Sequence, residues 1–477
     1  MRTHRIKTPF GSKYYVNADI TASGIPEETI EQYIKTNIEP YYANTHSNNH
    51  NGKLMAHYIE ESKNIIRKSI HTLEDDRVIF TGNGCTGAVR HLIHSLGLYK
   101  EHTENVSIFM SVLEHHSNYL PWKHVPCELV IIPVVMDTGI IDLKILEEEL
   151  NKRKHTRNIC SFTACSNVTG VIQPVYDIAK LVHSCGGFIF FDFAASAPYV
   201  PINMHKDDIS FFDAIYISTH KFVGGVGTPG ILVANKRLFM NNEPFYPGGG
   251  TTVFDYSNNL RYCDNIETRE SGGTPNIIGS IKAGLVFDLK CNKLRYIRMR
   301  NREINRMVHA KLESIQGIIV LNPSSGLNIN QLPIYSIVIK PYHYNLVTIL
   351  FNDLFGIQVR GGISCCSLYA QQVKKNNTIC SLTHCGWVRI TFHYLMSNDV
   401  VNYILTAIRY IAKNIHMLVR NYQYNKDDNT WSFIGYKKFL PKLKCSEDGH
   451  FLLKNAKVIL TKRILHEQLA DIGIIYM

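Results

Sequence analysis

A lysine stands at the end of an apolar, strand-like run near the middle of this 477-residue chain. Residues 214–217 have the pattern of a buried strand, and Ser218, Thr219, His220 and Lys221 follow them directly, ahead of a glycine-rich turn. A partly desolvated lysine has a lowered pKa and acts as an amine nucleophile towards an aldehyde. The position therefore predicts that Lys221 forms a Schiff base. The alternative is a solvated lysine that starts a surface loop.

An aspartate, Asp192, ends a second apolar run, the aromatic and aliphatic residues 188–191. A carboxylate in such a place is costly to bury unless a cation holds it. A protonated pyridine nitrogen is one such cation. Asp192 is therefore predicted to bind the ring nitrogen of a pyridine-type cofactor.

A glycine-rich segment, GNGCTG at residues 82–87, lies between the strand-like run 78–81 and a helix-like run that contains Val89. Glycines let backbone N–H groups approach an anion, and a helix N-terminus favours negative charge. The segment has neither the Gly-Lys-Ser/Thr of a Walker loop nor the Rossmann spacing. It indicates a phosphate cradle, with a plain tight turn as the alternative.

Two further strand-like runs end in polar residues. Residues 106–110 lead to Glu114, His115 and His116, and residues 159–164 lead to Ser166 and Asn167. A histidine ring at such an end could stack on a flat heterocycle. Metal binding by the adjacent histidines is less favoured, because neighbouring side chains usually point in different directions.

Together these strand ends offer a phosphate cradle, a stacking ring, an acid for a ring nitrogen and a Schiff-base lysine, which is the set that pyridoxal phosphate needs. On these residues the chain resembles the class V aminotransferase family, and within it the cysteine desulfurase and selenocysteine lyase branch. The resemblance covers roughly residues 14–410. The family-like motifs are EHHSNYLPW (114–122), SNVTG (166–170), DFAASAP (192–198), STHKFVGGVGTPG (218–230), GGTPN (272–276), RGGISC (360–365) and VRITFHY (388–394).

The resemblance implies a set of cofactor contacts for pyridoxal 5'-phosphate. Lys221 would form the Schiff base, Asp192 would bind the pyridine nitrogen, and His115 would stack on the ring. The other implied contacts are Asn167 near the phenolic oxygen, Cys85, Thr86, Ser218 and His220 at the phosphate, and Thr274 from the neighbouring subunit of a homodimer.

The resemblance also implies how an amino-acid substrate is held. Arg389 would bind its carboxylate, a bidentate task that suits a guanidinium group, and Asn44 and Arg360 are further predicted substrate contacts. Cys365 aligns with the sulfur-accepting cysteine of the desulfurases, and a nearby cation such as Arg360 would favour its thiolate form. Cys366, directly after it, could be the reactive residue instead, or a packing residue.

The sequence departs from the desulfurase pattern at three places, and these departures bear on which branch of the family the chain resembles. Ala195 stands where desulfurases usually carry a glutamine, so one hydrogen bond to the cofactor is missing. Ser47 follows His46 where an arginine is frequent, and the segment before Thr274 has an extra glycine.

Strand-like runs alternate with helical patterns from Val78 to about Ala234, which predicts an α/β fold with a mostly parallel sheet. The residues that could do chemistry lie where its strands end. The resemblance implies the fold type I architecture of pyridoxal-phosphate enzymes, with a smaller α+β C-terminal domain. The predicted units are an N-terminal arm (1–75), a large cofactor-binding domain (76–290), a small domain (291–424) and an extension of unassigned role (425–477). A long connecting helix is expected at 293–315.

The loop 361–386 is long for a compact domain and such loops are often functional. A zinc site there is a weak alternative, because the spacings match no common ligand pattern, and no metal is predicted. The residues in question are Cys365, Cys366, Cys380, His384 and Cys385.

Composition narrows the class of protein. Hydrophobic content of 45% and charged content of 19% are typical of a globular protein. The sequence offers no secretory signal pattern or membrane-spanning run, and its twelve cysteines lack the rhythm of a disulfide scaffold. A cytoplasmic location is therefore expected. The net charge of +11 fits an anionic cofactor and substrate at least as well as nucleic acid.

The leading prediction is a pyridoxal-phosphate enzyme that removes sulfur from cysteine through a persulfide on Cys365. The alternative within the family is an aminotransferase or related lyase, in which no thiol is needed. A third interpretation, from another class of protein, is an enzyme that has lost its activity and serves as a scaffold or binds nucleic acid. Retention of Lys221, Asp192, His115 and Arg389 together argues against it.

Overall fold

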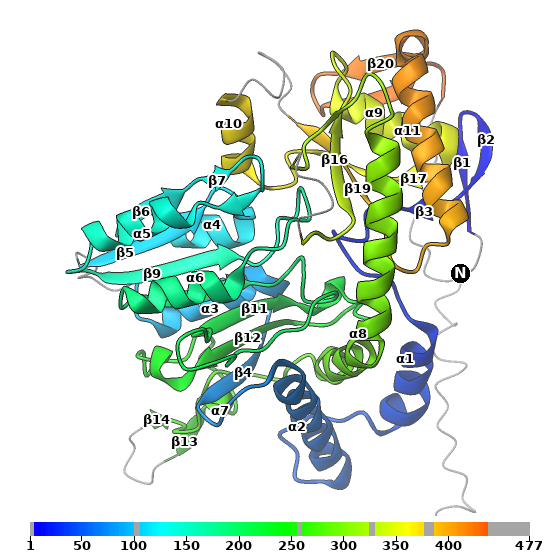
Figure 1. Cartoon of the computed structure of the whole chain (residues 1–477). Helices are drawn as coiled ribbons and strands as arrows, with labels where there is room; N and C mark the ends of the chain where they lie inside the picture. Colours follow the sequence, from blue (N-terminus) through cyan, green and yellow to red (C-terminus); the bar gives the residue numbers. More distant parts are fainter. Residues whose placement is uncertain (1–3, 100–104, 255–259, 324–329, 376–385, 437–477) are drawn as a thin grey trace, which may run out of the picture. The chain divides into compact units, whose positions relative to one another are not determined.

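The computed structural model describes residues 4–99, 105–254, 260–323, 330–375 and 386–436. Its larger sheet has seven strands and lies to one side of the long helix labelled α8 (Ile277–Leu312; Figure 1). The strand order is β4-β12-β11-β10-β9-β5-β6. The strands are β4 (Asp76–Thr81), β5 (Val106–Ser111), β6 (Glu128–Ile132), β9 (Arg157–Thr163), β10 (Phe188–Asp192), β11 (Ala214–Ser218) and β12 (Gly230–Asn235). Only β12 is antiparallel to its neighbours. The prediction of a mostly parallel α/β sheet is confirmed.

Helices cover both faces of this sheet, which is why its strands read as nearly continuous apolar runs. In β11, Ile215 and Ile217 face one core cluster, and Ala214 and Tyr216 face the other. The first cluster includes residues of α2 (His50–Ile70), α5 (Leu143–Lys152), α6 (Val175–Ser184) and the start of α8 (Ile277–Leu312). The second includes residues of α3 (Gly84–Ser95) and α4 (His116–Lys123).

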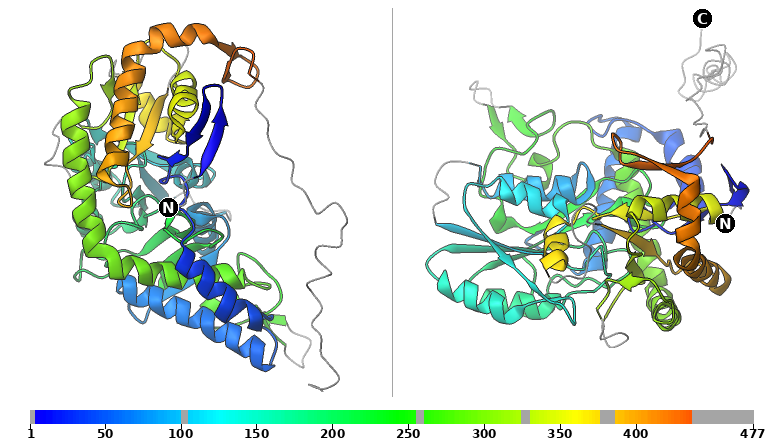
Figure 2. Two further views of the ribbon diagram at one scale, coloured as in Figure 1. Left: turned by 90° about the vertical axis from the view of Figure 1, so that its right-hand side faces the viewer. Right: turned by 90° about the horizontal axis from the view of Figure 1, so that it is seen from above.

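Helix α8 leads from the large sheet to a second, smaller sheet (Figures 1 and 2). The long connecting helix was predicted at 293–315, but it begins at Ile277. Its first turns are buried on most sides between α2 and the large sheet, so they lack the one-sided apolar pattern that marks a surface helix.

The smaller sheet is antiparallel, in the order β15-β16-β19-β18, and packs with α9 (Tyr344–Phe355) and α11 (Asn398–Leu418) around its own core. Its strands are β15 (Ile319–Val320), β16 (Ile334–Val338), β18 (Arg360–Gly362) and β19 (Trp387–Thr391). These elements have the α+β character predicted for a small domain. The exact domain limits stay a prediction.

The N-terminal arm and the chain after α11 add short elements to this frame. They are β1 (Arg5–Thr8), β2 (Gly11–Tyr14), β3 (Val16–Asn17), which pairs with β17 (Ile357–Gln358), α1 (Glu28–Tyr33), and the hairpin of β20 (Tyr422–Asn425) and β21 (Thr430–Phe433). Trp431 and Phe433 pack against the core of the smaller sheet. The rest of the predicted extension, residues 437–477, lies outside the described residues. Among the residues that are described, no helix has the length and apolar character needed to span a membrane.

Candidate active site

A cavity of about 240 Å³ lies at the carboxyl ends of the sheet strands and gathers most of the predicted site residues. β10 delivers Asp192, and the single helical turn after β11 delivers Lys221. The predicted residues that line the cavity are Cys85, Thr86, His115, Asn167, Asp192, Ser218, His220, Lys221, Arg360, Cys365 and Arg389. Asn44 and Thr274 lie elsewhere.

Burial in this cavity disfavours the charged forms of both Asp192 and Lys221. Burial raises the pKa of Asp192, although the backbone N–H of Ala194 donates to its Oδ1 at 2.8 Å. Burial lowers the pKa of Lys221, as a Schiff-base lysine requires. No residue in the described part of the chain forms a salt bridge with Asp192. A buried acid without such a partner fits the pyridinium nitrogen of a bound cofactor.

The glycine-rich segment forms the start of α3, whose N-cap residue Asn83 makes no capping hydrogen bond with its side chain. Gly84 has a positive φ of 57°, and a Cβ there would lie 2.7 Å from Ser218 Oγ and 2.8 Å from a ring carbon of His220. The cradle therefore requires glycine at this position. Burial lowers the pKa of His220 to about 4, so its ring is neutral and can exchange hydrogen bonds with a phosphate. These features fit a phosphate group at the predicted place.

His115 is the N-cap of α4 and lines the cavity. Its Nδ1 accepts from the backbone N–H of Ser117 at 3.1 Å, which fixes the ring. Burial, followed by the charge of Lys221, lowers the pKa of His115 to about 3. A neutral, oriented imidazole suits stacking on a cofactor ring. No cluster of possible metal ligands occurs in the described residues, and Cys380, His384 and Cys385 lie outside them.

Cys365 and Cys366 have different surroundings. Cys365 is partly exposed and lines the cavity, and a guanidinium nitrogen of Arg360 lies 3.6 Å from its Sγ. Cys366 is fully buried, and its thiol lies 3.3 Å from the backbone oxygen of Leu113. Burial also raises the pKa of the Cys366 thiol. This geometry makes Cys366 the packing residue and leaves Cys365 as the accessible thiol.

The turn that carries Cys365 has an unusual backbone. Ser364 and Cys365 have consecutive positive φ angles of 52° and 56°, a conformation that costs a non-glycine residue about 1–2 kcal/mol. Hydrogen bonds from the large sheet's loops hold it: Asn167 Nδ2 donates to the oxygen of Ser364 at 2.9 Å, and the N–H of His116 donates to the oxygen of Cys365 at 2.8 Å. The Asn167 amide, predicted to lie near the cofactor's phenolic oxygen, thus contacts the cysteine turn.

Arg389 is 2% exposed and is held by Asp19, whose Oδ1 accepts from its Nη2 at 2.7 Å. Its Nη1 donates to the oxygen of Asn167 at 3.2 Å, while its buried Nε has no hydrogen-bond partner among the described residues. Asp19 was not predicted, because nothing in the N-terminal arm marks it as a partner of a residue so distant in the sequence.

Glu114 is another buried acid near the cavity, and no role was predicted for it from the sequence. Its carboxylate accepts from Ser111 Oγ at 2.5 Å, the N–H of Thr163 at 3.0 Å and Asn118 Nδ2 at 2.7 Å. These donors favour the anion, but burial outweighs them and raises the pKa of Glu114 to about 7. The network ties the loop of His115 to the end of β9.

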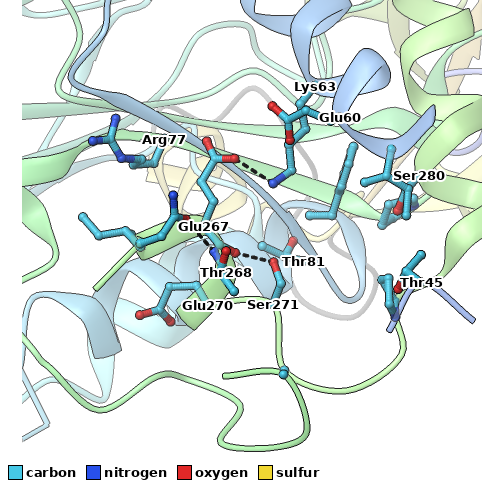
Figure 3. Close-up of a pocket in the computed structure, with 18 of the residues that line it drawn as sticks. Thr45, Glu60, Lys63, Arg77, Thr81, Glu267, Thr268, Glu270, Ser271 and Ser280 are labelled. Atoms are coloured by element: carbon cyan, nitrogen blue, oxygen red, sulfur yellow. Dashed lines mark hydrogen bonds and ion pairs between the residues drawn. The ribbon is translucent and has the colours of Figure 1, made fainter. Parts of the chain in front are cut away.

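Asn44 and Thr274 are exposed and hydrogen-bonded to each other, with Asn44 Nδ2 2.9 Å from Thr274 Oγ1. The segments around them line a larger cavity of about 1020 Å³, part of which is shown in Figure 3. Charged residues of this cavity pair with one another, as Lys63 does with Glu267 at 2.7 Å (Figure 3). It contains none of the residues predicted for chemistry.

Known proteins resemble this chain in sequence and in fold. The family described as Aminotransferase class-V matches residues 16–404. A probable cysteine desulfurase of Halalkalibacterium halodurans is 28% identical over 69% of this chain and 79% of that protein. One from Methanothermobacter thermautotrophicus is 26% identical over 71% of this chain and 80% of its own length. The apo structure of a cysteine desulfurase from Thermococcus onnurineus NA1 superposes with a TM-score of 0.72 at 23% identity, covering 84% of this chain and 95% of that one. This structural likeness shows a shared fold.

Proposed function

The chain belongs to the class V aminotransferase family, and from that premise we propose that it is a cysteine desulfurase whose sulfur acceptor is Cys365. Enzymes of this family depend on pyridoxal phosphate, and this chain is such an enzyme. The observation that carries the proposal is a thiol, Cys365, that lines the same cavity as Lys221 and Asp192.

The cofactor, when bound, supplies an electron sink that makes bonds near the substrate's amino group easier to break. Lys221 would hold it and move a proton at Nζ, Asp192 would keep its ring nitrogen charged, and His115 would cover its ring. Arg389 Nε, buried and without a partner among the described residues, would donate to the substrate carboxylate.

The thiolate of Cys365 would attack the substrate sulfur. The carbon–sulfur bond of cysteine breaks, a sulfur–sulfur bond forms on Cys365, and the substrate carbon takes up a proton, so that cysteine leaves as alanine. Arg360, 3.6 Å from Sγ, places a positive charge next to the attacking thiolate. A reductant such as dithiothreitol then releases the sulfur as sulfide.

The test is the release of sulfide and alanine from cysteine by the purified enzyme in dithiothreitol. We expect Cys365→Ser to abolish both while the absorbance of the bound cofactor stays unchanged. Cys291→Ser, which changes an exposed cysteine on α8, is the matched control and should keep full turnover. Full activity of Cys365→Ser would contradict the proposal, and transamination by that variant would favour the aminotransferase alternative.

We also infer a homodimer and a cytosolic location. A dimer would let Thr274 reach the neighbouring subunit's cofactor, as the family resemblance implies, since within one chain Thr274 lies outside the cavity of Lys221. All nine cysteines in the described residues are free thiols, which suits a reducing compartment.

A further inference from the structure

A second cavity of about 890 Å³ adjoins the candidate active site. It lies between α8, the start of α6 and the loop that follows β10, and its size is within the range of small-molecule sites. Phe193, Ser196 and Tyr199 of that loop line it, whereas Ala194 and Ala195 of the same loop line the cavity of Lys221. The two cavities therefore share one loop as a wall.

One wall of this second cavity is positively charged. Arg298, Arg302 and Arg306 line it from α8, and residues four apart stand above one another on a helix, rising about 6 Å per step. Lys206, in the loop after β10, lines the same cavity and adds one more positive charge. Of the described residues that line the cavity, Asp177 alone is acidic, so the arginine row gives it a net positive field.

The arginine row is not used to hold the fold together. The guanidinium groups of Arg298, Arg302 and Arg306 are exposed and form no ion pair or hydrogen bond with any other residue the structure describes. Arg300, on the same helix, is different: it is buried, donates to the oxygen of Met396 at 2.7 Å and pairs with Glu303. The row is therefore free to bind an external group.

The lining residues also include two polar atoms that are buried without a partner in the described structure, Ser196 Oγ and Gln331 Nε2. Leaving such a group unpaired is energetically unfavourable. Around them the wall is ordered, because Asn305 Nδ2 donates to the oxygen of Gln331 at 2.6 Å and Tyr335 donates to Asn305 Oδ1 at 3.1 Å. The cavity thus combines a row of free cations with a fixed polar wall.

From this combination we propose that the second cavity binds a ligand with two or more adjacent phosphate groups. A guanidinium group matches a phosphate oxygen pair with two parallel hydrogen bonds. Three such groups in a row on one helix face offer more positive charge than a single phosphate would neutralise. A phosphate chain, either free or as part of a nucleotide, fits the row.

The test is calorimetric titration of the cofactor-loaded enzyme at physiological salt with three probes: inorganic tripolyphosphate, a nucleoside triphosphate and a short single-stranded RNA. We expect saturable binding of tripolyphosphate at one site per chain. The variant Arg302→Glu/Arg306→Glu should weaken it by at least about tenfold, because both cations are replaced by anions. Much tighter binding of the nucleoside triphosphate would identify a nucleotide as the ligand, and equal binding a free phosphate chain.

The matched control is Lys293→Glu/Arg295→Glu, which makes the same charge change at exposed positions of α8 that do not line the cavity. This control should bind tripolyphosphate as the unmodified enzyme does. An equal loss in both variants, the absence of saturable binding, or binding of RNA alone would overturn the proposal. Unchanged cofactor absorbance shows that each variant is folded, and Arg302→Gln/Arg306→Gln repeats the test without introducing acids.

Discussion

Asp192 and Lys221 each stand in a place that disfavours their own charge. Burial raises the pKa of Asp192 and lowers that of Lys221. We expect Asp192→Asn to keep the fold but to lose at least about tenfold in kcat/KM, or ~1.4 kcal/mol, because an amide cannot keep a pyridine nitrogen protonated. Cysteine turnover and cofactor absorbance, measured side by side, check this. Turnover close to that of the unmodified enzyme would mean that the ring nitrogen has another partner.

Lys221→Ala tests the Schiff base directly. The amine of Lys221, on the helical turn after β11, is the predicted attachment point, so borohydride reduction of the yellow enzyme should leave a cofactor-bearing peptide that contains Lys221. The Lys221→Ala variant should carry no such adduct after the same treatment. Mass spectrometry of the digested protein provides the measurement. An adduct on a different lysine would contradict the assignment of Lys221 as the Schiff-base residue.

Glu114 gives a pH-dependent contribution to stability. Its folded pKa of about 7 lies above the ordinary value of 4.5, so the folded protein binds this proton more tightly than the unfolded chain does. The contribution is therefore fully present below pH 4.5 and is lost as the pH rises towards 7, a change on the order of 3 kcal/mol. Urea unfolding at pH 5 and pH 7.5 should show this slope, and Glu114→Gln should lack it. The same slope in both proteins would assign it to other groups.

At the residue scale, the sequence predicted groups that follow directly on apolar strands, because that position is visible in the local pattern. Lys221, Asp192 and His115 are examples, and they do line one cavity. Asp19 as the partner of Arg389, and the hydrogen bonds of Glu114, depend on contacts between distant segments, which no local pattern reports. The family resemblance singled out Cys365, but the local pattern alone did not separate it from Cys366, because adjacent residues share the same local signal.

The turn between β18 and α10 (Ser367–Lys375) shows how an element positions one atom. Ser364 has a φ of 52°, which a β-branched residue tolerates poorly and glycine accepts freely. We expect Ser364→Val to lower cysteine-dependent sulfide release by about tenfold, since the strain of about 1–2 kcal/mol would shift Cys365. Ser364→Gly removes the same hydroxyl and should retain more activity. Equal losses in the two variants would point to the hydroxyl, which accepts from Trp387 Nε1, and not to the backbone.

At the element scale, the strands, the helices and the mostly parallel character of the sheet were predicted, but the reversed direction of β12 was not. The apolar run of β12 looks like those of its neighbours, yet β12 is antiparallel to β11 and β4. Its direction follows from the short connection after Lys221, which returns the chain along the adjacent strand. The start of α8 at Ile277 was not predicted. Its first turns are buried on most sides, so the helical period of their apolar residues is faint.

At the scale of the whole molecule, the position of Thr274 motivates the last prediction. Thr274 bonds to Asn44, both are exposed, and neither lines the cavity of Lys221 in the same chain. If a second copy supplies Thr274, the active form is a homodimer with sites completed across the interface. Light scattering of the purified enzyme should then give twice the 54.4 kDa of the chain.

Mixing two inactive variants tests the shared site. Lys221→Ala removes the attachment point, and Thr274→Tyr places a bulky ring where the neighbour's cofactor phosphate is expected. A mixed dimer holds one site with an intact Lys221 from the Thr274→Tyr chain and an intact Thr274 from the Lys221→Ala chain. We therefore expect co-refolded variants to regain sulfide release that neither has alone. An active monomer, or the failure of a proven mixed dimer to regain activity, would mean that Thr274 contributes nothing to the neighbouring site. Its role would then be the hydrogen bond to Asn44 in its own chain.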